Sequence, residues 1–276
     1  MFGRTALFPL NFGGLLLGVS STALIAMSGA YTHAVWPLRG ICLTTVRTVG
    51  WALAVFLFLA LLNRVRSGAS VSLRAVVLSS VLLCAPFFLT QPIFAGDLYA
   101  YVAGAKVSAI GNPYVLTPSV LGTDVILNGV APVWQTQPSA YGPLWNIISS
   151  GFGHLTANSL MLFMNYRVLA LAGVLVCAWF IAKATSPMHA ALISLNPIVL
   201  VDAVADGHHD ILVGLAVLAA VTWLRRPVRS SFALAAATAL KFVPLIVAPV
   251  FIASDEPGRR RVAAIWIAMA DRKSVV

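Results

Sequence analysis

The sequence predicts an all-α protein, a bundle of transmembrane helices with one long external loop that carries an amphipathic helix. Three observations indicate this fold class. Of the 276 residues, 60% are hydrophobic and only 9% are charged, so one soluble core cannot bury the apolar surface. The apolar residues form long runs, several of membrane-spanning length. The only long polar interruption extends from Gln91 to Pro143.

The first part of the chain contains three predicted spans, because ~20 helical residues cross a hydrocarbon core of ~30 Å. They cover residues 7–31, 41–63 and 75–94. Arg64, Arg66 and Arg74 surround the link between the second and third spans. Since cytoplasmic links carry an excess of Lys and Arg, we place this link and the N-terminus inside. The third span then leads to the outer face.

The external loop covers residues 95–143 and is longer than a connection between neighbouring helices requires. Asp97 opens about three turns of amphipathic helix over residues 98–110, and a Gly-Asn-Pro-Tyr stretch at residues 111–114 ends it. The remainder is rich in Pro and Gly. Functional residues are often found on such loops, so we expect chemistry here.

Beyond the loop, residues 144–155 are apolar but too short for a full crossing, which predicts a re-entrant or partly inserted helix. Further spans are predicted at residues 159–184, 189–204, 211–224 and 230–252. Pro197 must kink the second of these. Lys241 and Pro244 fall near the middle of the last one. An incomplete apolar run begins at residue 262, and we expect residues 1–276 to form a single integral-membrane domain.

The formal net charge of +10 comes from 18 basic residues that mostly flank apolar runs. This distribution suits membrane topology and anionic lipid headgroups, and no basic stripe indicates a nucleic-acid partner. Cys42, Cys84 and Cys177 lie in or beside apolar segments without paired spacing, so helix packing explains them.

Several motifs, taken in chain order, resemble one known family. Three of them resemble the first large outer loop of GT-C glycosyltransferases: Gly96-Asp97-Leu98-Tyr99-Ala100-Tyr101, Gly111-Asn112-Pro113-Tyr114 and Tyr141-Gly142-Pro143. Three more are similar to a second region of that group: Leu195-Asn196-Pro197, Asp206-Gly207-His208-His209-Asp210 and Leu240-Lys241-Phe242-Val243-Pro244. The set looks most like the polyprenyl-phosphomannose-dependent alpha-1,6-mannosyltransferases of actinobacterial lipoglycan assembly. The likeness covers roughly residues 75–253.

This resemblance implies a polytopic GT-C bundle in the plasma membrane with an extracytoplasmic active site. It implies inverting transfer of mannose from polyprenyl-phosphate mannose to a mannan or mannosyl-lipid acceptor, with membrane lipids around the protein. No cofactor is implied besides the lipid-linked donor, and a divalent cation stays an open alternative. Family members are longer and carry more spans after the Lys-Pro helix, so we expect a C-terminally truncated chain. His209 departs from the amide that the family has in its turn.

The resemblance implies that Asp97 is the catalytic base, since it matches the loop acid of the family. Attack by a sugar hydroxyl needs a carboxylate within hydrogen-bond reach. The residues alone leave an equal alternative, in which Asp97 only caps the helix that follows. Tyr99 and Tyr101 can stack on a sugar, although tyrosine at a membrane interface is the commoner explanation. Asn112, Tyr114 and Tyr141 can contact the sugar or the loop itself, and their motifs are primarily turn signals.

Departure of polyprenyl phosphate leaves negative charge that cations or hydrogen-bond donors must meet. The candidates are His208, His209 and Lys241, with Arg167 a weaker one. Asp210, which follows the histidines, is a further candidate for substrate binding. The alternatives are a capped Asp-Gly turn, a metal site with the neighbouring acids, and a lysine that reaches toward headgroups. Adjacent histidines do not easily share one face, which favours phosphate contact over metal.

Two other functions are compatible with the residues. A polar-lipid transporter or flippase also needs intramembrane Lys and Asp, but no repeat between the two halves is visible and the long one-sided loop favours an enzyme. An inactive fragment of the transferase is the other alternative. Asp124 is expected to be a solvated acid in a flexible turn, and a supporting role in the acceptor site is the less favoured alternative.

Overall fold

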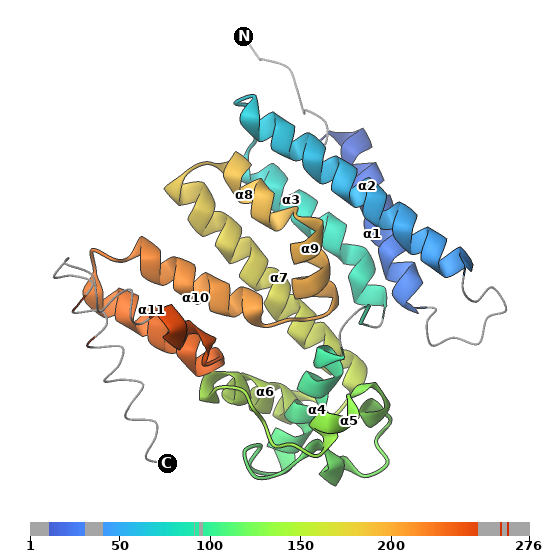
Figure 1. Cartoon of the computed structure of the whole chain (residues 1–276), viewed down its shortest axis with the longest axis vertical. Helices are drawn as coiled ribbons and strands as arrows, with labels where there is room; N and C mark the ends of the chain where they lie inside the picture. The colour runs from blue at the N-terminus through green and yellow to red at the C-terminus, as the bar shows by residue number, and fades with distance from the viewer. Residues whose placement is uncertain are drawn as a thin grey trace. The chain divides into compact units, whose positions relative to one another are not determined.

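The computed structural model describes residues 11–30, 41–90, 92–93, 96–247, 260 and 264, and its regular structure within them is all helical (Figure 1). The predicted all-α membrane fold class is confirmed. The contacts divide the chain into two compact units, where the sequence predicts one domain. The first unit contains Met1–Leu98 and Phe163–His208, and the second contains Tyr99–Leu162 and His209–Val276. The incomplete run predicted from residue 262 falls outside the described residues except for residue 264.

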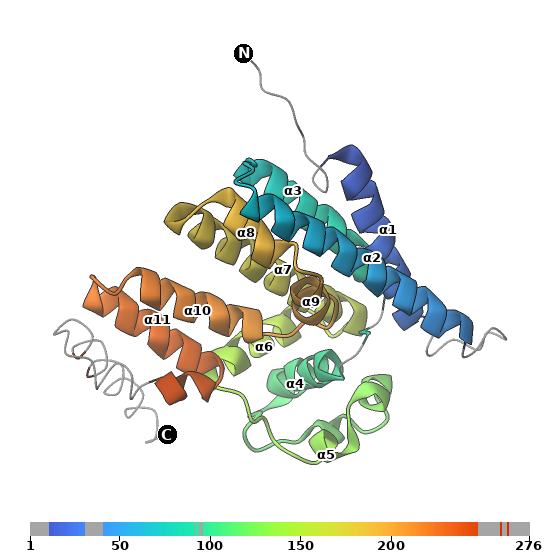
Figure 2. The ribbon, with the colours of Figure 1, turned by 45° about the horizontal axis from the view of Figure 1, so that its top comes forward.

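In the first unit, α1 (Phe12–Ala30) and α2 (Ile41–Arg66) pack side by side (Figures 1 and 2). Arg47 of α2 donates from its Nε to the Ser28 hydroxyl at 3.1 Å, so this arginine bonds to the end of α1. Helix α2 extends past the predicted end at residue 63 because Arg64 and Arg66 are favourable at the negative end of a helix dipole.

Helix α3 (Leu73–Cys84) ends earlier than the predicted span over residues 75–94 and continues as a short 3-10 helix, η1 (Ala85–Leu89). Ser72 begins α3, since its hydroxyl accepts a hydrogen bond from the Ala75 amide at 3.2 Å. The early end has a local cause. Pro86 lacks an amide hydrogen and its ring crowds the carbonyl four residues earlier, so a regular α-helix cannot continue through it.

Helix α7 (Ser159–Ala184) has the predicted bounds. The next predicted span, residues 189–204, is instead a broken helix made of α8 (Pro187–Ser194), α9 (Pro197–Val199) and a π-helix, η4 (Leu200–Ala205). The two halves are bent by 51°, which confirms the kink predicted at Pro197. A small buried core joins α2, α3 and α8 through Leu61, Val76, Met188, Ala191 and Leu195.

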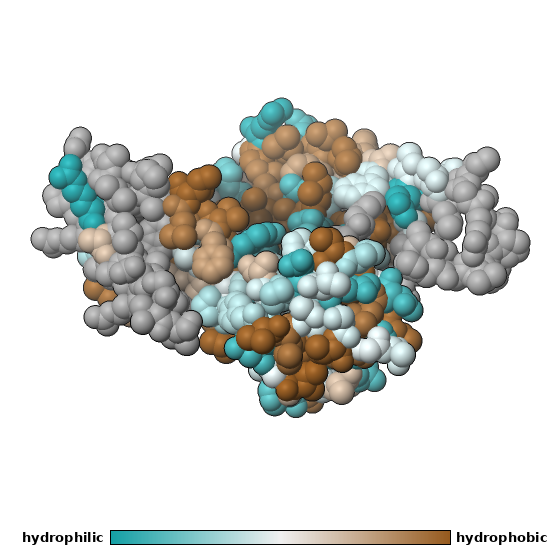
Figure 3. All heavy atoms as spheres, turned by 60° about the horizontal axis from the view of Figure 1, so that its bottom comes forward, coloured by the Kyte–Doolittle hydropathy of each residue, from teal (hydrophilic) through white to brown (hydrophobic). Residues whose placement is uncertain are grey.

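The predicted loop helix is α4 (Asp97–Ile110), which belongs to the second unit from Tyr99 onward. After it come short turns of helix: η2 (Pro118–Leu121), η3 (Val125–Gly129) and α5 (Pro132–Gln135). Large apolar residues such as Val115, Val125 and Trp134 are exposed on this loop. On the face of the molecule drawn in Figure 3, hydrophobic and hydrophilic residues are mixed. Residues 144–155 form the short helix α6 (Pro143–Leu155).

Helices α10 (Asp210–Thr222) and α11 (Pro227–Leu240) form an antiparallel hairpin (Figure 2). The span predicted over residues 230–252 is not one continuous helix, since α11 ends at Leu240 and a 3-10 turn, η5 (Val243–Val247), follows. Residues 248–252 lie outside the described residues. Pro244 explains this end, because its ring would clash with the Leu240 carbonyl and it has no amide to donate. The Leu240 carbonyl instead accepts from the Gly142 amide at 3.1 Å.

Two described helices, Thr44–Arg66 and Ser159–Ala184, are long and apolar enough to cross a membrane, and the bent pair Pro187–Ser194 with Pro197–Ala205 would make a third. Three shorter helices are apolar as well: Gly13–Ser28, Leu73–Leu89 and Asp210–Thr222. The protein is therefore a helical membrane protein. The predicted number of crossings stays a prediction.

Candidate active site

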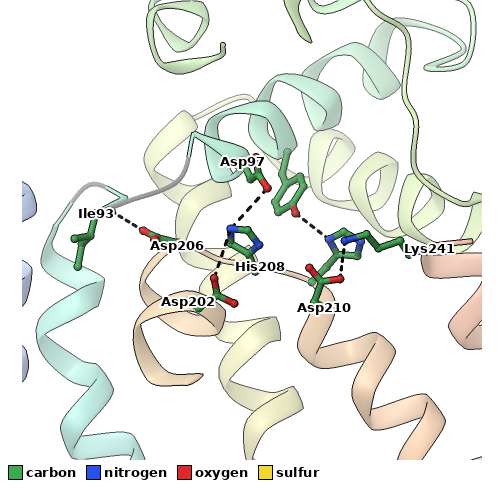
Figure 4. Close-up of polar contacts among 9 residues, drawn as sticks. Ile93, Asp97, Asp202, Asp206, His208, Asp210 and Lys241 are labelled. Carbon is green, nitrogen blue, oxygen red and sulfur yellow. Dashed lines mark hydrogen bonds and ion pairs between the residues drawn. The ribbon is translucent and has the colours of Figure 1, made fainter. Parts of the chain in front are cut away.

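Asp97 is the first residue of α4, and its carboxylate lies at the surface of the first unit. The side chain is 43% exposed, and Oδ2 lies 3.6 Å from Nε2 of His208 (Figure 4). An acid in the first turn is favourable because the helix dipole is positive at that end. Asp97 thus begins the helix, as the sequence predicts, and also faces an imidazole that comes from a distant part of the chain.

His208 reaches this position through an unusual piece of backbone. Broken helices with a π-turn recur at functional sites, and here η4 is followed by Gly207 with a φ of 68°. A side chain at this φ would be strained, and a Cβ would lie 2.6 Å from a Leu98 methyl carbon. The turn directs His208 toward Asp97 on one side and Asp202 on the other, where Nε2 lies 4.0 Å from Asp202 Oδ1.

His209, the next residue, belongs to a cluster of four rings in the second unit. Its Nδ1 and the Tyr101 hydroxyl are hydrogen-bonded at 2.9 Å, and Trp145 stacks on its ring with centroids 4.5 Å apart. Tyr141 packs edge-on against His209 and Tyr101. Tyr101, Trp145 and His209 are each at most 2% exposed, so this cluster mainly holds α4, α6 and the start of α10 together.

The aromatic residues predicted to bind sugar differ in how far they are buried in this cluster. Tyr101 and His209 are buried by their neighbours, whereas Tyr141 is only partly buried. Trp145 was missed in the sequence, because nothing in the apolar run after Pro143 indicates which residue turns inward. The two adjacent histidines contact different partners, as their neighbouring positions in the chain suggest.

Lys241 and Asp210 form an ion pair in the second unit, with Nζ 2.7 Å from Oδ1 (Figure 4). Asp210 is the first residue of α10, and Lys241 directly follows the last residue of α11. Lys241 therefore lies at the end of a helix and not, as the sequence predicts, near the middle of one. Its backbone is extended and its side chain is 34% exposed, so the ammonium group is accessible from outside the protein.

The other predicted loop residues mainly contact the loop itself. Asn112 Oδ1 accepts from the Tyr114 amide at 2.9 Å, and the Tyr114 hydroxyl donates to the Tyr141 carbonyl at 3.1 Å. Tyr99 packs its ring so closely on Gly129 that a Cβ there would overlap it. These contacts fold the loop, while Asn112 and Tyr114 stay exposed and Tyr99 is half-buried.

Asp124 is held firmly, contrary to the flexible turn that the sequence predicts. Its carboxylate accepts from Lys106 Nζ at 2.6 Å and from the Ile126 amide at 3.0 Å, which joins α4 to η3. The hydrogen bond from Lys106 and that from the Ile126 amide lower the pKa of Asp124 below its ordinary value of 3.8. A depressed pKa stabilises the fold above about pH 4, and this contribution is lost as the pH falls through the folded-state pKa.

Within the described part of the chain, no group of three or more His, Cys, Asp and Glu side chains is arranged to hold a metal ion. The polar contacts of the candidate residues form two separate sets. One set contains Asp97, Asp202 and His208, and the other contains Asp210 and Lys241.

Three curated proteins are similar to part of this chain. It is 27% identical over 177 residues to alpha-(1->6)-mannopyranosyltransferase A of Mycobacterium tuberculosis, a stretch that covers 60% of this chain and 34% of that protein. It is 30% identical over 158 residues to alpha-(1->6)-mannopyranosyltransferase B of Corynebacterium glutamicum, covering 52% and 26% respectively. A probable alpha-(1->6)-mannopyranosyltransferase of Mycolicibacterium smegmatis is 28% identical over 137 residues, covering 46% and 24%.

The matched stretches thus span 24–34% of the length of these relatives. No solved structure matches the chain. A family model described as alpha-(1->6)-mannopyranosyltransferase, N-terminal domain, matches residues 1–254, which include every candidate site residue discussed above. The chain therefore belongs to the alpha-(1->6)-mannopyranosyltransferase family.

Proposed function

We propose that this chain carries the catalytic base of a mannosyltransferase that uses polyprenyl-phosphate mannose as donor. The acceptor is a mannan or a mannosyl lipid, and the reaction takes place at the outer face of the plasma membrane. The family membership supports the class of reaction. The observation that carries the proposal is the Asp97 carboxylate, exposed at the first turn of α4 and 3.6 Å from the His208 imidazole.

The proposed step is a single displacement that inverts the sugar carbon. The acceptor hydroxyl oxygen attacks C1 of mannose as the bond from C1 to the phosphate oxygen breaks. The hydroxyl proton passes to the Asp97 carboxylate, and polyprenyl phosphate leaves with the bonding electrons. A base in hydrogen-bond reach typically contributes about 10²–10⁴ in rate. His208, when protonated, would hold the carboxylate in its ionised and oriented form.

Lys241 is the side chain best suited to the phosphate of the donor. A lysine ammonium is a compact charge with three donors, so it can bond to Asp210 and a phosphate oxygen at once. Asp210 would then orient the ammonium group. We propose a supporting role for His209, because its ring is buried among aromatic residues and fixes Tyr101.

The proposal is tested with membranes that contain the full chain, polyprenyl-phosphate mannose carrying labelled sugar, and a short mannan acceptor. We expect label to appear in the acceptor, at position 6 of the accepting mannose. Label that moves between leaflets without transfer would instead indicate a flippase. A folded chain that does neither would contradict the proposal.

Replacing Lys241 by methionine tests the phosphate contact. Lys241→Met should raise the apparent KM for the lipid donor about tenfold, because a charge-assisted hydrogen bond to phosphate is lost. The KM for the acceptor should stay within about twofold of its original value, since the acceptor does not carry the phosphate. Initial rates over a range of donor concentrations measure both effects.

Lys183→Met is the matched control, because Lys183 is an exposed lysine in the last turn of α7. It should leave the donor KM unchanged. Equal donor dependence in the two variants would rule out phosphate binding by Lys241.

A further inference from the structure

Two charged residues of the first unit, Arg167 and Asp206, are almost fully buried although neither has a role in the proposed chemistry. Each is 1% exposed. A buried charge is costly unless hydrogen bonds replace its water, so such residues persist where their bonds fix a particular geometry. Arg167 bonds to both of the segments that lead to Asp97 and His208, and Asp206 joins one of these segments to the other.

Arg167 of α7 connects the two segments through their carbonyl groups. Its Nη1 donates to the Thr90 carbonyl at 2.5 Å, where the chain leaves η1. Its Nε and Nη2 donate to the Ala205 carbonyl at 2.9 and 2.7 Å, at the end of η4. The planar guanidinium fits this arrangement because it presents several donors in fixed directions.

Asp206 makes the second connection. Its Oδ1 accepts a hydrogen bond from the Ile93 amide at 2.5 Å, across 113 residues of sequence (Figure 4). Ile93 precedes Asp97 by four residues, and Asp206 precedes His208 by two. The positive φ of Gly207 then turns the chain, and the His208 amide donates to the Asp202 carbonyl at 3.3 Å. The bond between Ile93 and Asp206 therefore joins the two segments within a few residues of the Asp97–His208 pair.

We infer that Arg167 and Asp206 are positioning residues that set the distance between Asp97 and His208. They do not touch the substrate, since both are buried, and this explains why Arg167 is not available as the phosphate ligand considered from the sequence. The inference rests on the proposed function for its catalytic consequence. Its structural part, the link between residues 90–93 and 205–206, can be tested without any transfer activity.

The first measurement is hydrogen exchange in the full chain in detergent. Asp206→Ala removes the acceptor of the Ile93 amide, so exchange of that amide should rise at least tenfold. Asp206→Asn keeps an acceptor oxygen and should restore protection. Ser194→Ala is the control, because Ser194 is equally buried in the first unit but bonds within its own helix to the Ala190 carbonyl. Unchanged exchange at Ile93 in Asp206→Ala would overturn the inference.

The second measurement is the kinetics of transfer per folded molecule. Asp206→Ala should lower kcat about 100-fold with little change in the donor KM, because displacement of a reacting group by about 1 Å costs that much. Asp206→Asn should recover most of the rate. A residue that only stabilises the fold would lower the folded fraction and leave kcat per folded molecule unchanged, which would also overturn the inference.

Arg167→Lys is the second variant, for the case in which Asp206→Ala does not fold. Lysine has no planar group with donors in fixed directions, so it cannot reproduce the hydrogen bonds of Arg167 to the Thr90 and Ala205 carbonyls. We therefore expect faster exchange around residues 90–93 and a kcat at least tenfold lower. Normal exchange in this variant would likewise contradict the inference. If the original chain transfers no sugar, the proposed function fails, while the exchange measurements still decide whether the link exists.

Discussion

Asp97→Asn should lower mannosyl transfer by about 10²–10⁴, the usual contribution of a general base, while the chain remains folded in the membrane. Asparagine has nearly the same shape and keeps an oxygen toward His208, but it cannot take the proton of the acceptor hydroxyl. The loss should appear in kcat, because the carboxylate is needed when the new bond forms and not when the substrates bind. Initial rates at saturating donor and acceptor measure it.

Asp124→Asn is the control for this experiment, since it removes the other described carboxylate of the same loop. Asparagine keeps one acceptor oxygen, so it retains the bond from the Ile126 amide and loses the one from Lys106. Since asparagine is also a favourable residue at the start of a helical turn, the loop should hold its fold. Transfer should stay within about threefold of the original rate, because the hydrogen bonds of Asp124 go to Lys106 and to the Ile126 amide, which have no part in the proposed step. Retained turnover in Asp97→Asn would show that another group accepts the proton.

Much of the helical architecture could be predicted because apolar runs and their breakers are local features. Helix α7 has the predicted bounds since its run contains neither proline nor a turn signal. Proline also accounts for the errors. The apolar run around Pro244 looks continuous to a count of hydrophobic residues, yet the backbone there cannot remain helical, so Lys241 comes to a helix end rather than to mid-span.

The candidate site was predictable only in its parts. Asp97, His208 and Lys241 stand out in an apolar sequence because ionisable residues are few. Their partners depend on long-range packing that no periodicity reveals, as with His208 beside Asp97 and Trp145 on His209. The sequence makes Arg167 a weak candidate for phosphate binding. Its hydrogen bonds to the Thr90 and Ala205 carbonyls, which no local pattern predicts, explain its place in the fold.

Two glycines in α6 should have opposite effects on stability when each is replaced by alanine. Gly153 lies against α4 so closely that a Cβ would overlap the Ala105 carbonyl oxygen, and a helix backbone cannot move aside as a side chain can. Gly153→Ala should therefore destabilise the chain by about 1–3 kcal/mol through overpacking. Gly151 has no atom within 4 Å of the same position, so Gly151→Ala should stabilise it by about 0.5–1 kcal/mol.

Reversible unfolding in mixed micelles, followed by near-UV circular dichroism, measures both changes against the original chain. The two substitutions add the same methyl group to the same helix, two residues apart. Helix propensity therefore favours both, and only the contact with α4 differs between them. If Gly153→Ala were as stable as Gly151→Ala, α4 and α6 would not pack at this distance. Since α4 begins at Asp97, the same result would remove the support that α6 gives to the helix of the proposed base.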